Sequence, residues 1–445
     1  MVVTRVKLRS PIGPIAVGVL LFLQIFSPAR AILFLLLIIS GVLGISYYWA
    51  RELGRGIQLH RFRRYGWAQV GDIIEERFIL RNAGIMPAIW VDIRDHSNLP
   101  GYAASRATGV GARGTTRWTT EGSCSQRGIY TLGPMELHTS DPFGLFDVTL
   151  EHQYSESFVV YPPLASIPRL FEPRGVSRGS ARTNIRTLDL TTNAGGVRQY
   201  VPGDALNRLH WRTTARRSTP NDEKFFVKEF DLEPSGDLWI IVDMDTNAQA
   251  GQGLESTEEY AVILAASLAN EMLLANHAVG LFTHTDGPLV VPPKKGHQQL
   301  WEILRVLAGL HAESDASLGE VLSLFEPIAG RGMSAAVLTP SPDPEWLSGL
   351  GSVLRHGLHM HALLLDRASF GGEGNVDGIF QALANLGVAG QIIAKGFPFA
   401  FLSQKRRQRP TYRTLGTGRV VIVDKGREEQ AEWVAVGTHN QSDSA

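Results

Sequence analysis

The chain has 445 residues, which is longer than one typical domain, so two or three domains are expected. Its 43 Lys and Arg residues are matched by 43 Asp and Glu residues, and this balance disfavours a nucleic-acid binder that works through a basic surface. Cys124 is the single cysteine, which excludes an internal disulfide and a metal site built from cysteines alone.

Residues 11–50 are predicted to form a transmembrane hairpin of two helices. Two uncharged apolar runs, Pro11 to Phe26 and Ala31 to Ala50, are separated by a short break that contains Arg30. The second run has about the 20 residues that a membrane-spanning helix needs, and the first run is near the short limit. A signal peptide is the alternative for the first run, and a buried soluble helix pair is the alternative for both. A second apolar run so close to the first favours the hairpin.

Basic residues flank this predicted hairpin on both sides, and its connection holds only Arg30. The positive-inside rule therefore predicts a multi-pass protein of the cell membrane, with both termini and the soluble domains in the cytoplasm. Tyr47, Tyr48 and Trp49 close the second run and suit the aromatic belt of a membrane interface. The flanking basic residues are Arg5, Lys7 and Arg9 before the hairpin, and Arg51, Arg55, Arg61, Arg63 and Arg64 after it.

Residues 66–162 are predicted to form an immunoglobulin-like β-sandwich. Short alternating runs, such as Ile73 to Arg81 and Ile89 to Ile93, are punctuated by Gly, Pro and Asn at the spacing of sandwich strands. Within this region, Asp141 to Phe146 reads Asp-Pro-Phe-Gly-Leu-Phe, which combines turn dipeptides with apolar side chains. We interpret it as a hydrophobic corner of the sandwich, with a partner-docking loop as the alternative.

Residues 163–234 combine a basic loop, up to residue 197, with a compact motif. Pro202-Gly203 predicts a tight turn, and Asp204 after it predicts the N-cap of a helix that runs from Ala205 to about Ser218. An ordered, capped, basic segment is unusual for a linker, so we interpret the motif as an interaction element. Its candidate residues are Arg198, Tyr200, Pro202, Gly203, Asp204, Arg208, Trp211, Arg212 and Arg216.

Arg208, Arg212 and Arg216 are spaced four residues apart, which places them on one face of this predicted helix. They could bind an acidic partner, or they could form internal salt bridges with the acidic strand that follows, Phe225 to Glu233. The motif lies between the predicted sandwich and the next domain, so it could act as a clasp that joins them. The residues predicted to hold it in place are Arg198, Tyr200, Asp204 and Trp211.

Residues 235–425 alternate between strand and helix patterns, which predicts an α/β domain with a doubly wound parallel sheet. The apolar run from Asp237 to Asp243 is typical of a buried parallel strand. Ser256 and Glu259 form a capping-box pattern that begins a helix ending near Ala275. Residues 426–445 are polar and are predicted to be a tail.

The loop after the first of these strands holds Asp243, Asp245 and Asn247, whose side-chain oxygens are of the type that Mg²⁺ prefers. The position is similar to that of the Asp-x-Ser-x-Ser metal signature of von Willebrand factor A domains, but only Asp243 matches. The site is therefore predicted to be degenerate, and no cofactor other than Mg²⁺ is considered. A metal-dependent ligand-binding or hydrolytic domain that uses this loop is the alternative function.

Several motifs resemble those of the domain-of-unknown-function 58 family of bacterial membrane-anchored proteins. They are Arg127-Gly128-Ile129-Tyr130, Leu132-Gly133-Pro134, Asp141 to Phe146, Tyr161-Pro162 and Arg198-x-Tyr200-x-Pro202-Gly203-Asp204, with Arg208, Trp211, Ala215-Arg216 and Lys228-Glu229 after the last. The resemblance implies a von Willebrand factor A-like domain. It also implies a MoxR-type AAA+ ATPase as partner, and in some cases a transglutaminase-like membrane protein.

No established catalytic activity comes with this resemblance. We therefore expect a non-enzymatic membrane scaffold or adaptor that works with the ATPase in the assembly or maturation of protein complexes. Its partners would be the bilayer and other proteins, and nucleic acid is not expected among them.

Overall fold

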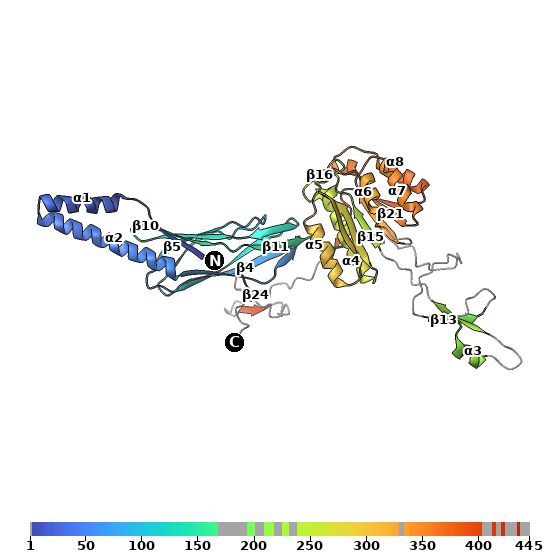
Figure 1. Ribbon diagram of the computed structural model, residues 1–445, viewed down its shortest axis with the longest axis horizontal. Coiled ribbons are helices and arrows are strands. Elements are labelled where there is room, and N and C mark those ends of the chain that lie inside the picture. The colour runs from blue at the N-terminus through green and yellow to red at the C-terminus, as the bar shows by residue number, and fades with distance from the viewer. Residues whose placement is uncertain are drawn as a thin grey trace. The chain divides into compact units, whose positions relative to one another are not determined.

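The computed structural model describes residues 2–167, 194–200, 209–217, 225–230, 238–328, 333–402, 412–414, 420–422 and 434–436 (Figure 1). These residues group into two compact units. Unit 1 comprises Met1–Ala165, Leu304–Leu310 and Phe401–Ala445, and unit 2 comprises Ser166–Ile303 and His311–Ala400. Most of the predicted basic loop lies outside the described residues.

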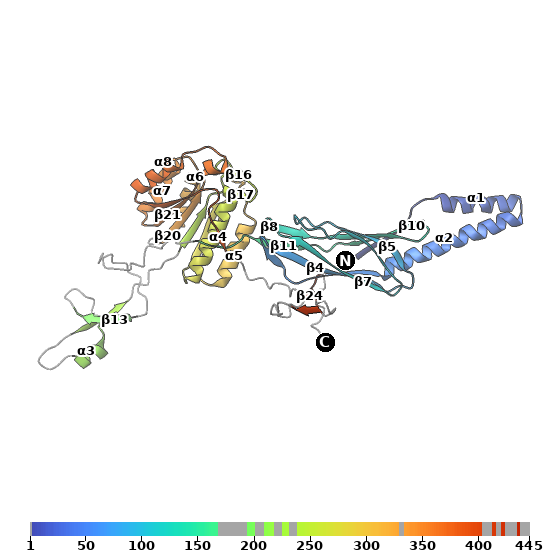
Figure 2. The same ribbon diagram turned by 180° about the vertical axis from the view of Figure 1, so that it is seen from behind.

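Two apolar helices follow the first strand of unit 1. Helix α1 (Ile12–Phe26) has 15 residues and none is buried, whereas α2 (Arg30–Gly56) has 27 residues and buries side chains only from Ser46 onward. The two helices lie side by side (Figure 1, Figure 2). Among the described residues, α2 is the one helix that is long and apolar enough to cross a membrane, and α1 is a shorter apolar helix.

The basic segment before α1 is a strand, β1 (Val2–Leu8), which the sequence analysis did not predict. It pairs antiparallel with β10 (Phe146–His152), from Val2 opposite His152 to Leu8 opposite Phe146. The last turns of α2 pack on the same strands, and the Thr4 hydroxyl donates to the carbonyl oxygen of Gly54 at 3.3 Å. Both ends of the helix pair therefore join one folded unit.

The rest of unit 1 is rich in strands, as predicted, and two sheets share one core. One sheet has the order β1-β10-β9-β5-β6 and the other β26-β2-β4-β7, with a three-stranded sheet β3-β11-β8 beside them. Strand β4 alternates buried and exposed side chains along its length, so Phe78 and Leu80 enter the core while their neighbours face away. Part of the predicted tail, β26, pairs with β2.

The strands of unit 1 that have not been given bounds above follow in chain order. They are β2 (Ile57–Arg63), β3 (Trp67–Gln69), β4 (Ile73–Asn82), β5 (Ala88–Asp95), β6 (Arg106–Val110), β7 (Thr115–Ser123), β8 (Gly128–Leu132), β9 (Met135–Ser140), β11 (Glu156–Tyr161), β24 (Tyr412–Thr414), β25 (Val420–Ile422) and β26 (Val434–Val436). Two further short strands are β12 (Ala165–Ser166) and β23 (Ala400–Phe401).

A buried charge network lies inside the strand-rich part of unit 1. The carboxylate of Glu76 is fully buried and accepts hydrogen bonds from Arg61 Nε at 2.9 Å, from Arg61 Nη2 at 2.6 Å and from the Tyr102 hydroxyl. Arg63 lies 3.8 Å from the other Glu76 oxygen and 2.9 Å from Glu156. Arg61 and Arg63 are thus paired inside the protein, and the basic residues available to a membrane surface are the others that flank the hairpin.

Unit 2 is built on a six-stranded sheet with the order β19-β18-β15-β20-β21-β22. Five of its strands are parallel, and β19 is antiparallel at one edge. In chain order these strands read 3-2-1-4-5-6, which is the doubly wound arrangement that the strand and helix alternation predicted. Helix α4 packs against strands of this sheet. Trp239 and Ile241 of β15 share a core with α6, α7 and α8.

The elements of unit 2 include a small module that precedes the sheet. They are β13 (Ala194–Gln199), α3 (Trp211–Arg217), β14 (Phe226–Phe230), β15 (Leu238–Val242), β16 (Gly251–Gln252), β17 (Glu255–Ser256), α4 (Thr257–Leu274), β18 (Val279–His284), β19 (Pro288–Lys294), α5 (His297–Ala308, whose last residues group with unit 1), α6 (Leu318–Phe325), β20 (Ser334–Thr339), α7 (Trp346–Arg355), β21 (His359–Leu365), a 3₁₀ turn (Arg367–Phe370), α8 (Val376–Asn385) and β22 (Ala389–Ile393).

Candidate functional site

The motif predicted around residues 198–216 folds as a β-hairpin with a short helix. Strands β13 and β14 pair antiparallel, and Arg198 lies opposite Val227 in this ladder. The chain leaves β13 at Tyr200, whose amide donates to the carbonyl oxygen of Phe225 at 2.8 Å. The Tyr200 ring meets the Phe225 ring edge-on, with 6.4 Å between centroids. Pro202, Gly203, Asp204, Arg208 and the Arg198 side chain lie outside the described residues.

The helix of this motif is shorter than predicted. Leu209, expected within the helix, instead forms a β-bridge with Val227, and the His210 amide donates to the carbonyl oxygen of Phe226 at 2.7 Å. Helix α3 begins only at Trp211, and the Thr213 amide donates to His210 Nδ1 at 3.1 Å. His210 therefore caps α3, whereas Asp204, predicted as the N-cap, lies outside the described residues. Pairing with β14 satisfies this backbone in place of the helix.

The outer face of α3 carries Arg212 and Arg216. At 100° per residue, both lie about 160° around the helix from Thr214, which is buried and whose hydroxyl accepts from the Phe226 amide at 3.0 Å. Trp211 lies at the first residue of the helix, about 60° from Thr214. Trp211 is 66% exposed, so it does not hold the motif in place as predicted. Leu209, Phe226 and Val227 fill the interior of the module instead. The motif thus presents an exposed tryptophan beside two arginines, which we call the α3 patch.

The predicted metal residues lie where the sheet topology places a ligand site. Connections leave β15 and β20 in opposite directions, so the crevice beyond their carboxyl ends is the topological switch point. Asp243 follows β15 and is fully buried. Its Oδ2 accepts from the Thr339 hydroxyl at 2.6 Å, and its Oδ1 accepts from the Asp245 amide at 3.1 Å.

Asp245 and Asn247 complete a local turn in this loop. Asp245 Oδ1 accepts from the Asn247 amide at 2.9 Å and from its side-chain nitrogen at 3.2 Å. Within the described ranges, no group of three or more His, Cys, Asp and Glu side chains is placed to hold a metal ion. Burial raises the pKa of Asp243 to about 6, although the hydrogen bonds from Thr339 and from the Asp245 amide oppose this rise.

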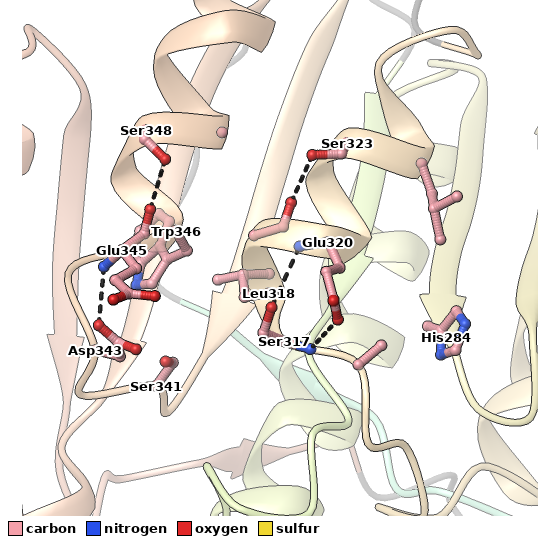
Figure 3. Close-up of a pocket in the computed structure, with 14 residues that line it drawn as sticks. His284, Ser317, Leu318, Glu320, Ser323, Ser341, Asp343, Glu345, Trp346 and Ser348 are labelled. Carbon is pink, nitrogen blue, oxygen red and sulfur yellow. Dashed lines mark hydrogen bonds between the residues drawn. The ribbon is translucent and has the colours of Figure 1, made fainter.

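A crevice of about 650 Å³ lies at the same edge of the sheet (Figure 3). It is lined by the N-terminal turns of α6 and α7, by Ser341 after β20 and by His284 at the end of β18. Its carboxylates come from Glu320, Asp343 and Glu345. The lining is polar and acidic, which suits a cationic group of a ligand better than an anion.

Two of these carboxylates are held by backbone amides. Glu320 and Ser317 form a reciprocal capping box at the start of α6, and Asp343 Oδ1 accepts from the Glu345 amide at 2.9 Å (Figure 3). Opposite them, His284 Nδ1 is 2.9 Å from the Ser314 hydroxyl. The sequence analysis missed this crevice, although Ser317 and Glu320 at the spacing of a capping box could have revealed α6.

The fold and these sites define a class of protein: an apolar helix pair and a strand-rich unit, followed by a β-β-α module and a doubly wound α/β domain. A family model described as "Protein of unknown function DUF58" matches residues 196–339, which run from β13 to the end of β20. The resemblance seen in the sequence is confirmed by this match, which covers residues 196–339.

Curated relatives support the same grouping. The chain is 26% identical over 188 residues to the uncharacterized protein YeaD of Bacillus subtilis (strain 168), covering 42% of this chain and 44% of YeaD. It is 23% identical over 164 residues to the uncharacterized protein Rv1480 of Mycobacterium tuberculosis (strain H37Rv), covering 36% and 50%. The match spans half or less of the length of these relatives.

Solved structures with similar parts cover about a quarter to a third of the chain. A von Willebrand factor type A structure from Catenulispora acidiphila covers 36% of this chain and 39% of that chain, with 14% identity and a TM-score of 0.26. A CARDB domain of the PF1109 protein from Pyrococcus furiosus covers 24% of this chain and 89% of that chain, with 12% identity and a TM-score of 0.17. At these TM-scores the doubly wound fold rests on the strand order alone.

Proposed function

We propose that the protein is a non-enzymatic scaffold or adaptor that is anchored in the cell membrane and recruits partner proteins through the α3 patch. The observation that carries this proposal is the 66% exposure of Trp211 within the family segment. Tryptophan and arginine are enriched among the residues that contribute most of the binding energy of protein interfaces, so Trp211 next to Arg212 suits an interface.

The two ends of the helix pair support the membrane part of the proposal. Strand β1 enters unit 1 before α1, and the end of α2 enters it afterwards, so a pair inserted in a bilayer must leave on the side where it entered. Basic residues such as Arg9 and Arg51 near these ends favour the cytoplasmic side. The protein would then be multi-pass, with its immunoglobulin-like and von Willebrand factor A-like domains in the cytoplasm.

The partner that we propose for the α3 patch is a MoxR-type AAA+ ATPase, with a transglutaminase-like membrane protein as a further member of the assembly. Arg212 and Arg216 stand at i and i+4 on one face of α3, so they can contact neighbouring carboxylates of one acidic surface. Trp211 beside them supplies the apolar anchor. Client proteins would be assembled or matured by the ATPase while this protein holds them at the membrane.

Trp211→Ala is expected to weaken binding of a MoxR-type ATPase by at least about tenfold, because an interface tryptophan commonly contributes more than 1.4 kcal/mol. The measurement is titration of the full-length protein in nanodiscs with labelled ATPase. The matched control is Leu274→Ala, since Leu274 is an equally exposed apolar side chain at the end of α4. Unchanged affinity in Trp211→Ala would remove the α3 patch from the proposal.

The second candidate function is a metal-dependent ligand-binding or hydrolytic site at the Asp243 loop. The position of Asp243 and Asp245 at the switch point favours it, because ligands of doubly wound sheets bind there. The Thr339 hydroxyl already occupies one Asp243 oxygen, and protein groups bond the other members of the loop.

Millimolar Mg²⁺ or Mn²⁺ is expected to leave the thermal unfolding temperature of the full-length protein unchanged if the scaffold function is correct. A site saturated to 100 times its dissociation constant would instead add about 2.7 kcal/mol of stability. Scanning calorimetry in detergent with and without each ion makes the comparison. Stabilisation that Asp245→Asn abolishes would favour the metal-dependent function.

A further inference from the structure

Two loops of unit 1 meet the helix pair where it joins the strands. The Arg9 amide donates to the carbonyl oxygen of Leu145 at 2.8 Å, so the loop before β10 lies beside the start of α1. Trp49 Nε1 donates to the carbonyl oxygen of Pro87 at 3.1 Å, so the loop between β4 and β5 lies beside α2. The Tyr47 ring packs edge-on against Phe146, with 5.7 Å between centroids. We call this end of unit 1 the helix-side end.

The helix-side end exposes large apolar side chains. Phe143 is 57% exposed at the tip of the loop before β10, and Ile85 in the other loop and Trp90 at the start of β5 are exposed as well. Tyr47 and Tyr48 of α2 are exposed beside them. The prediction of a hydrophobic corner therefore holds for Phe146, which packs on the core, and is wrong for Phe143.

The loop that carries Phe143 is rigidly built. The buried carboxylate of Asp141 accepts from the amides of Phe143 at 2.9 Å, Leu145 at 2.8 Å and Phe146 at 2.6 Å. Gly144 has a φ of 67°, a conformation that suits glycine in such a turn. A fixed turn therefore holds Phe143 away from the protein surface. Because this loop is already ordered, binding of a partner to Phe143 would cost little loop conformational entropy.

The length of the helix pair indicates what that partner is. The 15 residues of α1 rise by about 22 Å, and the part of α2 between Arg30 and the first buried residue, Ser46, has nearly the same length. The hydrocarbon core of a bilayer is about 30 Å thick. A pair this short can cross it only if the residues at its base also enter the interface.

The side chains at the base have the chemistry of a membrane interface. Tyr47, Tyr48 and Trp90 are of the type that forms aromatic belts at the headgroup level. Arg9, Arg51 and Arg55 are exposed on the segments that join the helices to the strands, where they can contact anionic headgroups. Apolar, aromatic and basic side chains are therefore gathered at the end of unit 1 from which the membrane helices leave.

We infer that the helix-side end of unit 1 is a second membrane contact, which lies in the headgroup layer with Phe143 inserted toward the acyl chains. This inference rests on the proposed insertion of α1 and α2. It assigns the Asp141 to Phe146 motif a lipid as its partner, and it fixes the strand-rich unit against the bilayer surface instead of leaving it tethered above.

Nitroxide labels at single introduced cysteines test this inference in the full-length protein, reconstituted in vesicles of phosphatidylethanolamine and phosphatidylglycerol. The native Cys124 is fully buried, so labelling of the introduced residue is selective. Phe143→Cys is the test position, and Leu37→Cys on the exposed face of α2 reports the helix pair. Ile73→Cys is the matched control, because Ile73 is 54% exposed and lies at the end of β4 that is far from the helices. The other end of β4 is Asn82, whose side-chain oxygen accepts from the Gly84 amide in the loop beside α2.

A label in lipid collides more often with oxygen, and a label in water collides more often with a water-soluble nickel chelate. The labels at Phe143→Cys and Leu37→Cys are expected to favour oxygen several-fold. The label at Ile73→Cys is expected to favour the nickel chelate. If the Phe143→Cys label is in water like the Ile73→Cys label while the Leu37→Cys label is in lipid, the second membrane contact is overturned. The proposed membrane anchoring of the scaffold by α1 and α2 would be unaffected by that result. A Leu37→Cys label in water would overturn the membrane insertion and this inference together.

Discussion

Glu76→Ala is expected to lower the free energy of unfolding of unit 1 by about 3–5 kcal/mol, because it removes the nearest counter-charge of the buried Arg61 and the hydrogen-bond acceptor of Tyr102. Glu76 is fully buried, and its carboxylate accepts both hydrogen bonds from Arg61 as well as the one from Tyr102. Arg63, directly across the strand pair, also faces it. Removing this carboxylate therefore takes both hydrogen-bonded contacts from Arg61 and the acceptor from Tyr102, and leaves Arg61 with Asp95 at 3.8 Å and Arg63 with Glu156 at 2.9 Å.

The titration behaviour of the partners reflects how strongly this network is coupled. Burial and the adjacent Glu76 charge both raise the pKa of Tyr102, so its phenol stays protonated and donates. Burial disfavours the charged form of Arg61, but the Glu76 carboxylate outweighs this and raises the pKa of Arg61. The Glu76 charge contributes to both effects, and the charge of Asp95, 3.8 Å from Arg61, adds to each.

The adjacent residue Glu75 provides the matched control. Its contact with Arg64 is an ion pair at 3.8 Å between partly exposed side chains, so Glu75→Ala is expected to cost less than about 1 kcal/mol. Hydrogen exchange of β4 amides in the full-length protein measures unfolding of this unit without assuming that the whole chain unfolds in one step. Equal effects of the two substitutions would show that the buried network does not stabilise the unit.

Hydrophobic patterns were sufficient to predict the α/β domain, because each of its elements repeats a local signal. The run at 238–242 is apolar at every position, which a parallel strand covered on both faces requires. Ser256 caps α4 by accepting from the Glu259 amide, as the sequence pattern indicated. Alternating strands and helices favour a doubly wound parallel sheet, whereas the order of its strands is seen only in the structure.

Features that depend on long-range pairing could not be predicted in the same way. The segment Val2 to Leu8 alternates weakly, and its basic residues resemble the flank of a membrane helix, so its role as an edge strand depends on β10, far along the chain. Arg61 and Arg63 likewise resemble flanking charges until the register of β2 on β4 brings them to Glu76. Local periodicity in the sequence does not show which residues are paired across neighbouring strands.

The candidate sites show the same division. The residues of the α3 patch were identified from the sequence, but Trp211 was expected to hold the motif in place, whereas its side chain is 66% exposed. The Asp243 loop was placed correctly after the first strand of the sheet. Its hydrogen bond to Thr339, across 96 residues, arises only because β20 lies beside β15.

Asp243 is expected to make the stability of unit 2 depend on pH in the opposite direction from ordinary paired carboxylates. Its pKa in the folded protein is about 6, because it is buried, whereas an unfolded chain has an aspartate pKa near 3.9. Between these two values the folded state binds more protons than the unfolded state. The free energy of unfolding contributed by Asp243 is therefore greatest below about pH 4 and is lost as the pH rises through about 6.

An asparagine side chain cannot titrate, so comparing the natural protein with Asp243→Asn separates the contribution of Asp243 to pH-dependent stability from that of the other carboxylates. The stability of the natural protein relative to Asp243→Asn is expected to fall by about 3 kcal/mol between pH 4 and pH 7, since each pKa unit corresponds to about 1.4 kcal/mol. Hydrogen exchange of β15 amides at a series of pH values, corrected for intrinsic exchange rates, measures the difference. Parallel stability profiles for the two proteins would contradict the raised pKa.

Thr339→Val provides the control for the cause of the shift. The Thr339 hydroxyl donates to the ionised carboxylate and lowers the pKa of Asp243, so its loss is expected to raise that pKa further and to extend the pH-dependent range upward. Valine keeps the shape of the side chain, which limits the change to the hydrogen bond. If Thr339→Val instead shifts the pH-dependent range of stability to lower pH, the Thr339 hydrogen bond does not lower the pKa of Asp243. The contact between Thr339 and Asp243 would then not determine the arrangement of the Asp243 loop.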